Sequence, residues 1–386
     1  SKAKKPIFYI GGGCINSGPK ASELVSKLVE MTGAPATMTL MGLGVLGSSH
    51  PNSLGMLGMH GMYEANMAMH DCDVMINIGA RFDDRVTGRL DAFSPNSKKI
   101  HIDIDESNIN KTIKVDVPVV GDVTSVLKSV LKVWKDNNLK TNQSDLKLWW
   151  DKINNWKKID CLHFTNNEKE IKPQYAIQRL YELTKDKKTY ITTEVGQHQM
   201  WAAQYYKFEK PNRWLTSGGL GTMGYGFPAA NGVQVAFPES LVIDIAGDAS
   251  ILMNIQELST AVQYRLNTKI FILNNSYMGM VRQWQQLLHG NRISESYSES
   301  LPDFVKLAEA YGATGISAKK PQDLDQAIIK MIETPGPVIM DCQVASLENC
   351  FPMIPSGKAH NDMLLGEDVT DEQVSTAIDD DGKIMV

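Results

Sequence analysis

The sequence predicts an α/β protein with two doubly wound parallel-sheet domains. A chain of 386 residues can hold two or three domains, each with a core of its own. Short apolar runs alternate with segments of helical period, and this alternation occurs twice along the chain. Strands that alternate with helices imply right-handed crossovers and a parallel sheet, whose ligands bind at the carboxyl ends of the strands.

The composition is that of an ordinary globular protein, with 42% hydrophobic and 22% charged residues. A net charge of -5 gives no reason to expect nucleic acid or an anionic membrane as a partner. No apolar stretch approaches the roughly 18 residues that span a bilayer, and the first residues lack the apolar centre of a signal peptide. The five scattered cysteines favour free thiols in a reducing compartment, so we expect a cytoplasmic enzyme or binding protein.

We expect the first domain over residues 1–139. A strand is predicted at residues 7–10, before three glycines, and a helix at residues 21–31, with Gly33 ending it. Further strands are predicted at residues 74–79, 100–104 and 117–120, and the last helix at residues 122–139.

A connector is expected over residues 140–172, because this stretch has neither Gly nor Pro and is rich in Lys, Asn and Trp. Its tryptophans are interpreted as packing anchors on a domain surface rather than as a platform for bases. The second domain is expected over residues 173–345, with strands at residues 190–193, 241–246, 269–273 and 338–342. Residues 346–386 form a tail that is either a flexible lid or a frayed terminus.

Two short strings carry the strongest chemical signal. Asp248 follows one predicted strand, and Asn275 follows the next one 27 residues later. A carboxylate and a carboxamide at the ends of parallel strands offer oxygen to Mg²⁺, which completes its octahedron with phosphate oxygens. The alternative is a pair of unrelated turns.

Two further strings predict contact with a ligand. Residues 217–226 hold a dense run of glycines, which lets backbone approach a ligand closely, although a helix packed tightly on a sheet also needs glycine. Residues 194–199 follow a strand and open a helix, where free backbone N–H groups can hold phosphate. His198 in this string is either a general acid–base residue or a histidine bonded to backbone beside the phosphates.

Together these strings resemble the thiamine diphosphate enzymes, and most of all the catalytic large subunits of acetohydroxyacid synthase, also called acetolactate synthase. The matching segments are residues 195–204, 218–230, 279–284, 57–61 and 79–88, with a bacterial-type tail at residues 349–361. The resemblance covers nearly the whole chain. It implies a Rossmann-like, FAD-associated middle domain over residues 1–139 and a thiamine diphosphate pyrophosphate-binding domain over residues 173–345.

By this resemblance, Asp248 and Asn275 bind Mg²⁺ through side chains, and Tyr277 binds it through its backbone carbonyl. Tyr277 departs from some relatives, which carry an acidic residue at this position. Because the proposed ligand is a backbone carbonyl, the change of side chain does not affect it. The resemblance implies catalytic roles for Gln197, His198, Met223 and Trp284, with Met223 beneath the bent cofactor and Trp284 along the substrate channel. On their own, Met223 and Trp284 are also ordinary core residues. The other implied cofactor contacts are Gly196, Gly221, Gly247, Ala249, Ser250, Met278, Gly279 and Met280.

The residues alone predict a flavin-binding site less specifically than they predict the Mg²⁺ site. Arg81 and Arg85 follow a predicted strand and could clamp the phosphates of a dinucleotide, but a surface ion-pair cluster would have the same sequence. The resemblance favours FAD. The contacts that it implies are Gly12, Gly13, Met59, His60, Gly79, Arg81, Asp83, Arg85, Asp105 and Asp122.

The implied reaction is the decarboxylation of pyruvate and condensation with a second 2-oxo acid, pyruvate or 2-oxobutyrate, in branched-chain amino acid biosynthesis. The implied partners are a second copy of the chain, as a homodimer or tetramer, and a regulatory small subunit. We expect a fragment that lacks the N-terminal domain with the activating glutamate, and hence trace activity from the chain alone. The alternatives are a related flavoprotein, pyruvate oxidase or glyoxylate carboligase, and an inert cofactor-binding fragment.

Overall fold

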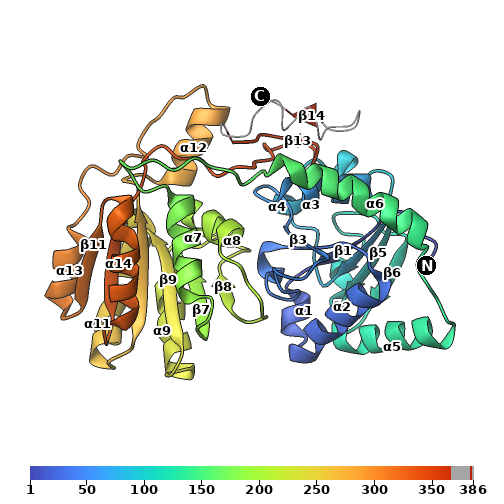
Figure 1. Ribbon diagram of the computed structural model, residues 1–386, viewed down its shortest axis with the longest axis horizontal. Helices are drawn as coiled ribbons and strands as arrows, with labels where there is room; N and C mark the ends of the chain where they lie inside the picture. The colour runs from blue at the N-terminus through green and yellow to red at the C-terminus, as the bar shows by residue number, and fades with distance from the viewer. Residues whose placement is uncertain (367–382, 385–386) are drawn as a thin grey trace. The chain divides into compact units, whose positions relative to one another are not determined.

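The computed structural model describes residues 1–366 and 383–384 (Figure 1). The described residues separate into two compact units. The first unit comprises Ser1–Phe164, Lys207–Pro211 and the described residues from Phe351 onward, and the second comprises Thr165–Tyr206 and Asn212–Cys350. These bounds differ from the ranges expected above: the first unit includes residues 140–164 of the expected connector, and the second unit extends to Cys350, within the expected tail.

The first unit is built on a six-stranded parallel sheet. In sheet order the strands are β3 (Ser53–Met56), β2 (Ala36–Met38), β1 (Pro6–Ile10), β4 (Val74–Ile78), β5 (Lys98–Asp103) and β6 (Val117–Val120). Strand β1 is buried at every position, as a central parallel strand should be. In its register Phe8 pairs with Ala36 on one side and Ile76 on the other.

Helices cover both faces of this sheet. They are α1 (Gly13–Asn16), α2 (Pro19–Thr32), α3 (Tyr63–Asp71), α4 (Asp84–Thr87), α5 (Val123–Asp136) and α6 (Gln143–Trp156). Helix α2 packs with α5, and α3 packs with α6. Helix α2 begins at a proline and ends at Gly33, whose φ of +68° is the left-handed conformation that glycine adopts easily.

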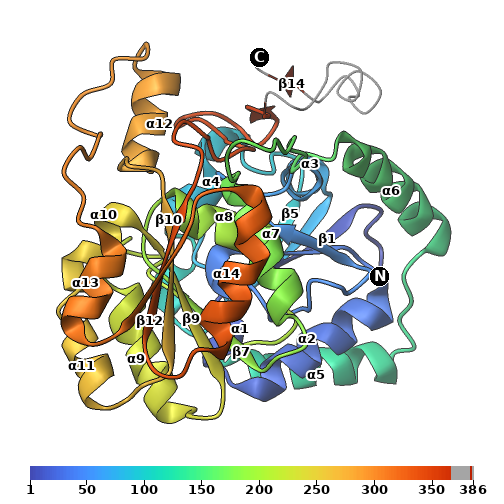
Figure 2. The ribbon, with the colours of Figure 1, turned by 60° about the vertical axis from the view of Figure 1, so that its left-hand side comes forward.

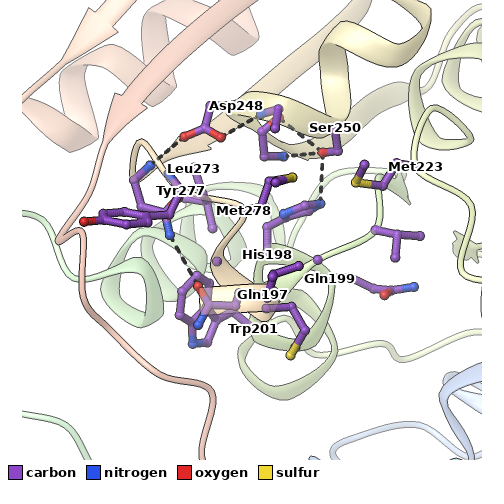
Figure 3. Close-up of a pocket in the computed structure, with 18 of the residues that line it drawn as sticks. Gln197, His198, Gln199, Trp201, Met223, Asp248, Ser250, Leu273, Tyr277 and Met278 are labelled. Atoms are coloured by element: carbon purple, nitrogen blue, oxygen red, sulfur yellow. Dashed lines mark hydrogen bonds between the residues drawn. The ribbon is translucent and has the colours of Figure 1, made fainter. Parts of the chain in front are cut away.

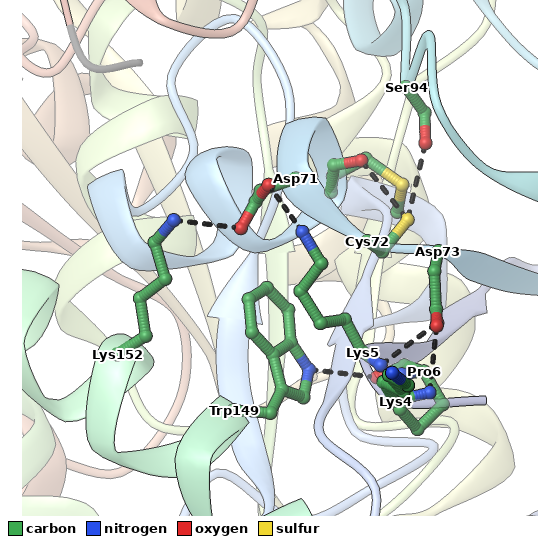
Figure 4. Close-up of polar contacts among 10 residues, drawn as sticks. Lys4, Lys5, Pro6, Asp71, Cys72, Asp73, Ser94, Trp149 and Lys152 are labelled. Carbon is green, nitrogen blue, oxygen red and sulfur yellow. Dashed lines mark hydrogen bonds and ion pairs between the residues drawn. The ribbon is translucent and has the colours of Figure 1, made fainter. Parts of the chain in front are cut away.

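Helix α6 belongs to the core of the first unit. Trp149, Ile153 and Trp156 are buried there, and the Trp149 Nε1 donates to the carbonyl of Pro6 at 3.0 Å. The start of β1 is held as well, since Asp73 accepts the backbone N–H groups of Lys4 and Lys5 at 2.7 and 2.9 Å (Figure 4). The tryptophans therefore act as packing anchors, although they lie in a core and not on a domain surface.

The described part of the tail adds little regular structure. Its strand β13 (Asp362–Met363) pairs in parallel with β14 (Lys383–Ile384). The expectation of a lid or frayed end falls partly on residues 367–382 and 385–386, which lie outside the described residues.

The second unit also has a six-stranded parallel sheet. In sheet order its strands are β11 (Thr314–Ala318), β12 (Val338–Gln343), β10 (Thr268–Asn274), β9 (Leu241–Gly247), β7 (Thr189–Thr193) and β8 (Trp214–Thr216). Strand β8 lies on one side of β7 and β9 on the other, so the winding direction reverses between β7 and β9. Ligands of open α/β sheets bind at such a switch point.

The helices of the second unit also pack on both faces (Figure 2). They are α7 (Pro173–Thr184), α8 (Gln197–Tyr205), α9 (Gly226–Ala236), α10 (Asp248–Ile251), α11 (Glu257–Gln263), α12 (Gly279–Leu288), α13 (Phe304–Tyr311) and α14 (Pro321–Glu333). Helices α9, α11 and α13 share one face, and α7, α8 and α14 share the other. Two doubly wound parallel sheets confirm the predicted fold class.

The predicted strands are present with small changes of bounds, while β2, β3, β8, β11, β13 and β14 were not predicted. All five cysteines are buried and free of disulfides, as expected. Across residues 1–366 and 383–384, no helix has the length and apolar character needed to cross a membrane.

Candidate functional site

A pocket of about 400 Å³ lies at the carboxyl edge of the second unit's sheet (Figure 3). The loops after β7, β9 and β10 line it, together with the glycine-rich loop before α9. The pocket thus includes the loops on both sides of the switch point between β7 and β9.

Asp248 lies directly after β9 and is 1% exposed. Its Oδ1 accepts the N–H of Ala249 at 2.6 Å, and its Oδ2 accepts those of Asn275 at 3.1 Å and Ser276 at 2.7 Å. Burial raises the pKa of Asp248 to about 6, and the three N–H donors oppose that rise. The Asp248 carboxylate therefore fixes both the loop after β9, to which it belongs, and the loop after β10.

The loop after β10 brings two further residues to the lining of the pocket, Asn275 and Tyr277. Asn275 Oδ1 accepts the backbone N–H of Tyr277 at 3.1 Å, and its Nδ2 donates to Gln197 Oε1 at 3.3 Å. Ser276 between them has a φ of +61°, which turns the chain sharply. Oxygen ligands of this kind suit a hard cation. Within the described ranges, no group of three or more His, Cys, Asp or Glu side chains could hold a metal, so phosphate and backbone oxygens would have to complete a site here.

Gln197 opens α8 and is held from several sides. Its Nε2 donates to Gln283 Oε1 at 2.8 Å and to the carbonyl of Glu348 at 2.9 Å. Gln283 Oε1 also accepts the N–H of Cys350 at 2.7 Å. Helix α12 and the chain near Glu348 thus fix the side chain of Gln197 at the pocket.

His198 lies beneath the pocket, 6% exposed, with its ring against two glycines. A Cβ on Gly196 would stand 2.8 Å from its Cε1, and one on Gly247 would stand 2.7 Å from its Nδ1. Ser250 Oγ is 3.5 Å from its Nε2. Burial lowers the pKa of His198 to about 3, so the ring is neutral near pH 7. The two roles predicted from the sequence, a general acid–base residue or a histidine bonded to backbone beside the phosphates, both stay predictions.

The glycine-rich loop combines both of the uses that its sequence allowed. Gly221 and Met223 line the pocket. Gly226 begins α9 and packs so closely on the sheet that a Cβ there would overlap Asp244 and stand 2.5 Å from the Glu194 nitrogen.

Two helices begin at the pocket, α8 at Gln197 and α12 at Gly279, while the four-residue turn α10 starts at Asp248. Neither Gly196 nor Met278, which precede α8 and α12, caps its helix with a side chain. The first N–H groups of a helix have no partner within the helix, and the helix dipole favours negative charge there. The pocket is therefore suited to bind a diphosphate.

The pocket brings together all of the second-unit residues predicted from the sequence except Trp284. The predicted residues that line it are Gly196, Gln197, His198, Gly221, Met223, Gly247, Asp248, Ala249, Ser250, Asn275, Tyr277, Met278, Gly279 and Met280. Trp284 is half-buried on α12 and is not among the lining residues.

Five lining residues were not predicted: Val195, Gln199, Trp201, Leu273 and Val281. Val195, Gln199 and Val281 adjoin predicted positions in the sequence, whereas Leu273 lies within β10. Trp201 follows Gln197 by four residues, so helical spacing could have found it.

The residues proposed for a dinucleotide lie near the carboxyl ends of the strands in the first unit. Gly12 and Gly13 follow β1, Met59 and His60 follow β3, and Gly79 and Arg81 follow β4. Met59 donates its N–H to the Arg85 carbonyl at 2.8 Å. The sheet reverses its winding between β1 and β4, so the glycines and Arg81 lie at its switch point.

The charged residues of this group are engaged in local contacts. Arg81 pairs with Asp83, and Arg85 pairs with Asp84 at 3.3 Å, with both arginines well exposed. Asp105 accepts the N–H of Ser107 at 2.9 Å, and Asp122 caps α5 by accepting that of Ser125 at 2.9 Å. These are the ion pairs and caps of a surface turn, and they leave the arginine heads accessible to an anion.

Comparison with known proteins agrees with both units. Residues 194–342 match the thiamine pyrophosphate enzyme C-terminal TPP binding domain, and residues 1–130 match the thiamine pyrophosphate enzyme central domain. The chain therefore belongs to the thiamine pyrophosphate enzymes.

Within these enzymes the chain is homologous to acetolactate synthase large subunits. It is 49% identical over 367 residues to the large subunit from Buchnera aphidicola subsp. Schizaphis graminum, across 94% of this chain and 63% of the relative. It is 45% identical to the acetolactate synthase isozyme 3 large subunit of Escherichia coli, across 95% of this chain and 64% of that relative. It is 46% identical to the large subunit of Cyanidium caldarium, across 94% of this chain and 61% of that relative. The chain thus spans less than two thirds of the length of these relatives.

Proposed function

We propose that the pocket of the second unit binds the diphosphate of thiamine diphosphate together with Mg²⁺. The observation that carries this proposal is the meeting of the N-termini of α8 and α12 with the Asp248 carboxylate in one pocket. The helix ends favour the phosphates, and the carboxylate favours the cation that accompanies them. The match to a TPP binding domain over residues 194–342 supports the identity of the cofactor.

The proposed Mg²⁺ ligands are the Asp248 carboxylate, the Asn275 carboxamide oxygen and the Tyr277 carbonyl. All three belong to residues that line the pocket, and all are hard oxygen donors. Thiamine diphosphate, when bound, supplies an electron sink for cleavage next to the keto group of a 2-oxo acid. The protein's part is to hold and orient it.

The roles of the neighbouring side chains follow from their environments. Gln197 is fixed by Gln283 and presents its amide beside Asn275. His198 is neutral and buried, so it supports the phosphate loops without adding charge. Met223 offers an apolar wall that makes no strong hydrogen bonds to compete with those of the cofactor. Trp284 remains proposed for the substrate channel.

We also propose FAD as the ligand of the first unit. Its sheet has the strand order 3-2-1-4-5-6, which in other proteins binds dinucleotides at the reversal point. Gly12, Gly13, Gly79 and Arg81 follow the two strands at that point. An accessible guanidinium can form paired hydrogen bonds with phosphate.

The reaction we propose is that of the relatives' name, acetolactate synthesis from pyruvate, with pyruvate or 2-oxobutyrate as the second substrate. We place it in branched-chain amino acid biosynthesis in the cytoplasm. The name "large subunit" supports a regulatory small subunit as partner, and we propose a homodimer or tetramer as the assembly.

Product analysis tests this function. Pyruvate is supplied with thiamine diphosphate, Mg²⁺ and FAD, and the products are quantified for the wild type and for Asp248→Ala. We expect acetolactate from the wild type, at the trace rates expected above for these 386 residues alone, and none above background from the variant. Acetyl phosphate formed in its place, or acetolactate formed equally by the variant, would contradict the proposal.

A further inference from the structure

Glu194 is a buried carboxyl group for which the proposed function has no use so far. It follows β7 directly, is 0% exposed and does not line the pocket. Its Oε1 accepts the N–H of Phe227 at 3.0 Å, and its Oε2 accepts the N–H of Gly224. The carboxyl group is therefore bonded to the backbone at the start of α9.

This contact supplies a cap that the helix itself lacks. Tyr225, which precedes α9, makes no side-chain cap bond. The unpaired N–H groups at a helix start attract an anion. Glu194 provides that anion from a neighbouring strand and thereby ties the glycine-rich loop to β7.

The same loop carries Met223 on the wall of the pocket (Figure 3). Gly221 and Gly224, on either side of it, have φ values of +66° and +90°, which glycine adopts at little cost. Gly224 is held at both of its polar groups, since its N–H donates to Glu194 and its carbonyl accepts from Asn254 Nδ2 at 2.6 Å. The backbone beside Met223 is thus fixed by two side chains from outside the loop.

A second buried carboxyl group lies close by. Asp244 is 0% exposed, and its Oδ1 accepts from Thr192 Oγ1 at 2.9 Å. Burial raises the pKa of both Asp244 and Glu194, and the charge of Glu194 raises that of Asp244 further. Two neighbouring buried carboxyl groups do not both ionise easily. The backbone donors around Glu194 favour its charged form.

We propose that Glu194 is a positioning residue: its carboxylate holds the loop from Gly221 to Phe227 so that Met223 supports the organic part of the cofactor. The inference rests on the proposed function of the pocket. The inference assigns recognition of the organic part of the cofactor to this loop and recognition of its diphosphate to other loops. Loss of Glu194 should weaken binding of the whole cofactor and spare binding of its diphosphate.

The test compares two ligands on the 386-residue chain, thiamine diphosphate and inorganic pyrophosphate, each titrated calorimetrically with Mg²⁺. Glu194→Gln removes the charge and keeps the size. We expect its affinity for thiamine diphosphate to fall at least about tenfold, the order expected for hydrogen bonds to a charged group, while pyrophosphate affinity stays within about twofold. Glu257→Gln, on α11, is the matched control and should change neither affinity.

A spectroscopic measurement on the cofactor-free chain reports on the loop directly. With ¹³C-methyl methionine, the Met223 signal is assigned by its loss in Met223→Leu. Glu194→Gln should shift or broaden that signal and leave the Met278 signal in place. If Glu194→Gln does not fold, Asn254→Ala removes the other tether of Gly224 and should produce the same change.

The outcomes separate the two levels of the account. No binding of either ligand to the wild type would contradict the proposed function itself. Normal binding to the wild type, with an unchanged Met223 signal and equal affinities in the variants, would overturn only the role of Glu194. Equal loss of both ligands in Glu194→Gln would also overturn it, because a general structural role predicts that result.

Discussion

The Oδ2 of Asp248 accepts the backbone N–H of Ser276 at 2.7 Å and so links the loops that follow β9 and β10. The same oxygen accepts the N–H of Asn275 at 3.1 Å. One carboxylate therefore orders the turn that carries Asn275 and Tyr277 at the pocket. Under the proposal above, Asp248 serves the cation site twice, as a ligand and as an organiser of the other proposed ligands.

Removal of this carboxylate should loosen the turn before any cofactor is added. In Asp248→Ala we expect the amides of Asn275 and Ser276 to exchange hydrogen at least about tenfold faster, because each loses its acceptor. Hydrogen exchange followed by NMR measures this. The amide of Ile272 within β10 is the internal control and should keep its rate; unchanged exchange at Asn275 and Ser276 would contradict the organising role.

Gly279 should tolerate no side chain. A Cβ there would overlap Gln197 Oε1 and stand 2.8 Å from its Cδ and 2.9 Å from Asn275 Nδ2. Gly279→Ala should therefore displace Gln197 or Asn275 and weaken Mg²⁺-dependent thiamine diphosphate binding by about tenfold or more, measured by calorimetry.

Gly232 offers the matched control for that substitution. It lies within α9, and a Cβ there would meet nothing within 4 Å. Gly232→Ala should leave cofactor affinity unchanged and raise stability by up to about 1 kcal/mol, as alanine favours helix. Equal affinities for Gly279→Ala and Gly232→Ala would contradict the tight packing at the pocket.

Much of this arrangement could be predicted from the sequence because local patterns determine it. Of the strands that place the pocket, β9 and β10 are mainly apolar runs, whereas three of the five residues of β7 are threonine, and each strand is followed by a polar string. Glycine density likewise marked the loop around Gly221 and Met223. These patterns predicted Asp248, Asn275 and the strings at residues 194–199 and 217–226, while the resemblance to the thiamine diphosphate enzymes implied the individual cofactor contacts.

The rest depends on contacts between distant residues. Strands β2 and β8 have three residues each, too few to show a period. The bond from Gln197 to Gln283 joins positions 86 residues apart. Trp149 and Trp156 could be recognised as anchors, but only tertiary packing decides that α6 lies in the core of the first unit.

Trp149 should be important for the stability of the first unit. It is 1% exposed, and its Nε1 bonds the Pro6 carbonyl. Trp149→Ala should lower the free energy of unfolding by about 3–5 kcal/mol through the cavity it leaves. Leu148, its neighbour on α6, is 67% exposed, and Leu148→Ala should cost less than about 0.5 kcal/mol in the same denaturant titration. Similar losses for the two variants would contradict the placement of α6.

Lys269 should make stability depend on pH. It is 0% exposed, and its Nζ donates to Asn267 Oδ1 and to the carbonyls of Thr334 and Gly336 at 2.6–2.7 Å. Burial lowers its pKa from 10.5 to about 8. Between these values the unfolded chain keeps a proton that the folded chain has released, so stability rises with pH.

The wild type should therefore gain about 1–3 kcal/mol relative to Lys269→Met between pH 7 and pH 10.5. Urea unfolding of both proteins across that range provides the measurement. Lys330→Met, at an exposed site near the end of α14, is the control. Its free energy of unfolding should change with pH in the same way as that of the wild type. A constant difference between wild type and Lys269→Met would show that the buried amine has an ordinary pKa.

Calorimetric titration of thiamine diphosphate tests the central claim most directly. The 386-residue chain is titrated with Mg²⁺ present and again with the metal removed by EDTA, and Asp248→Ala is titrated in parallel. The account predicts saturable binding by the wild type with Mg²⁺, and its loss both in EDTA and in the variant. Binding that is equally strong without the metal, or that survives Asp248→Ala unchanged, would contradict it.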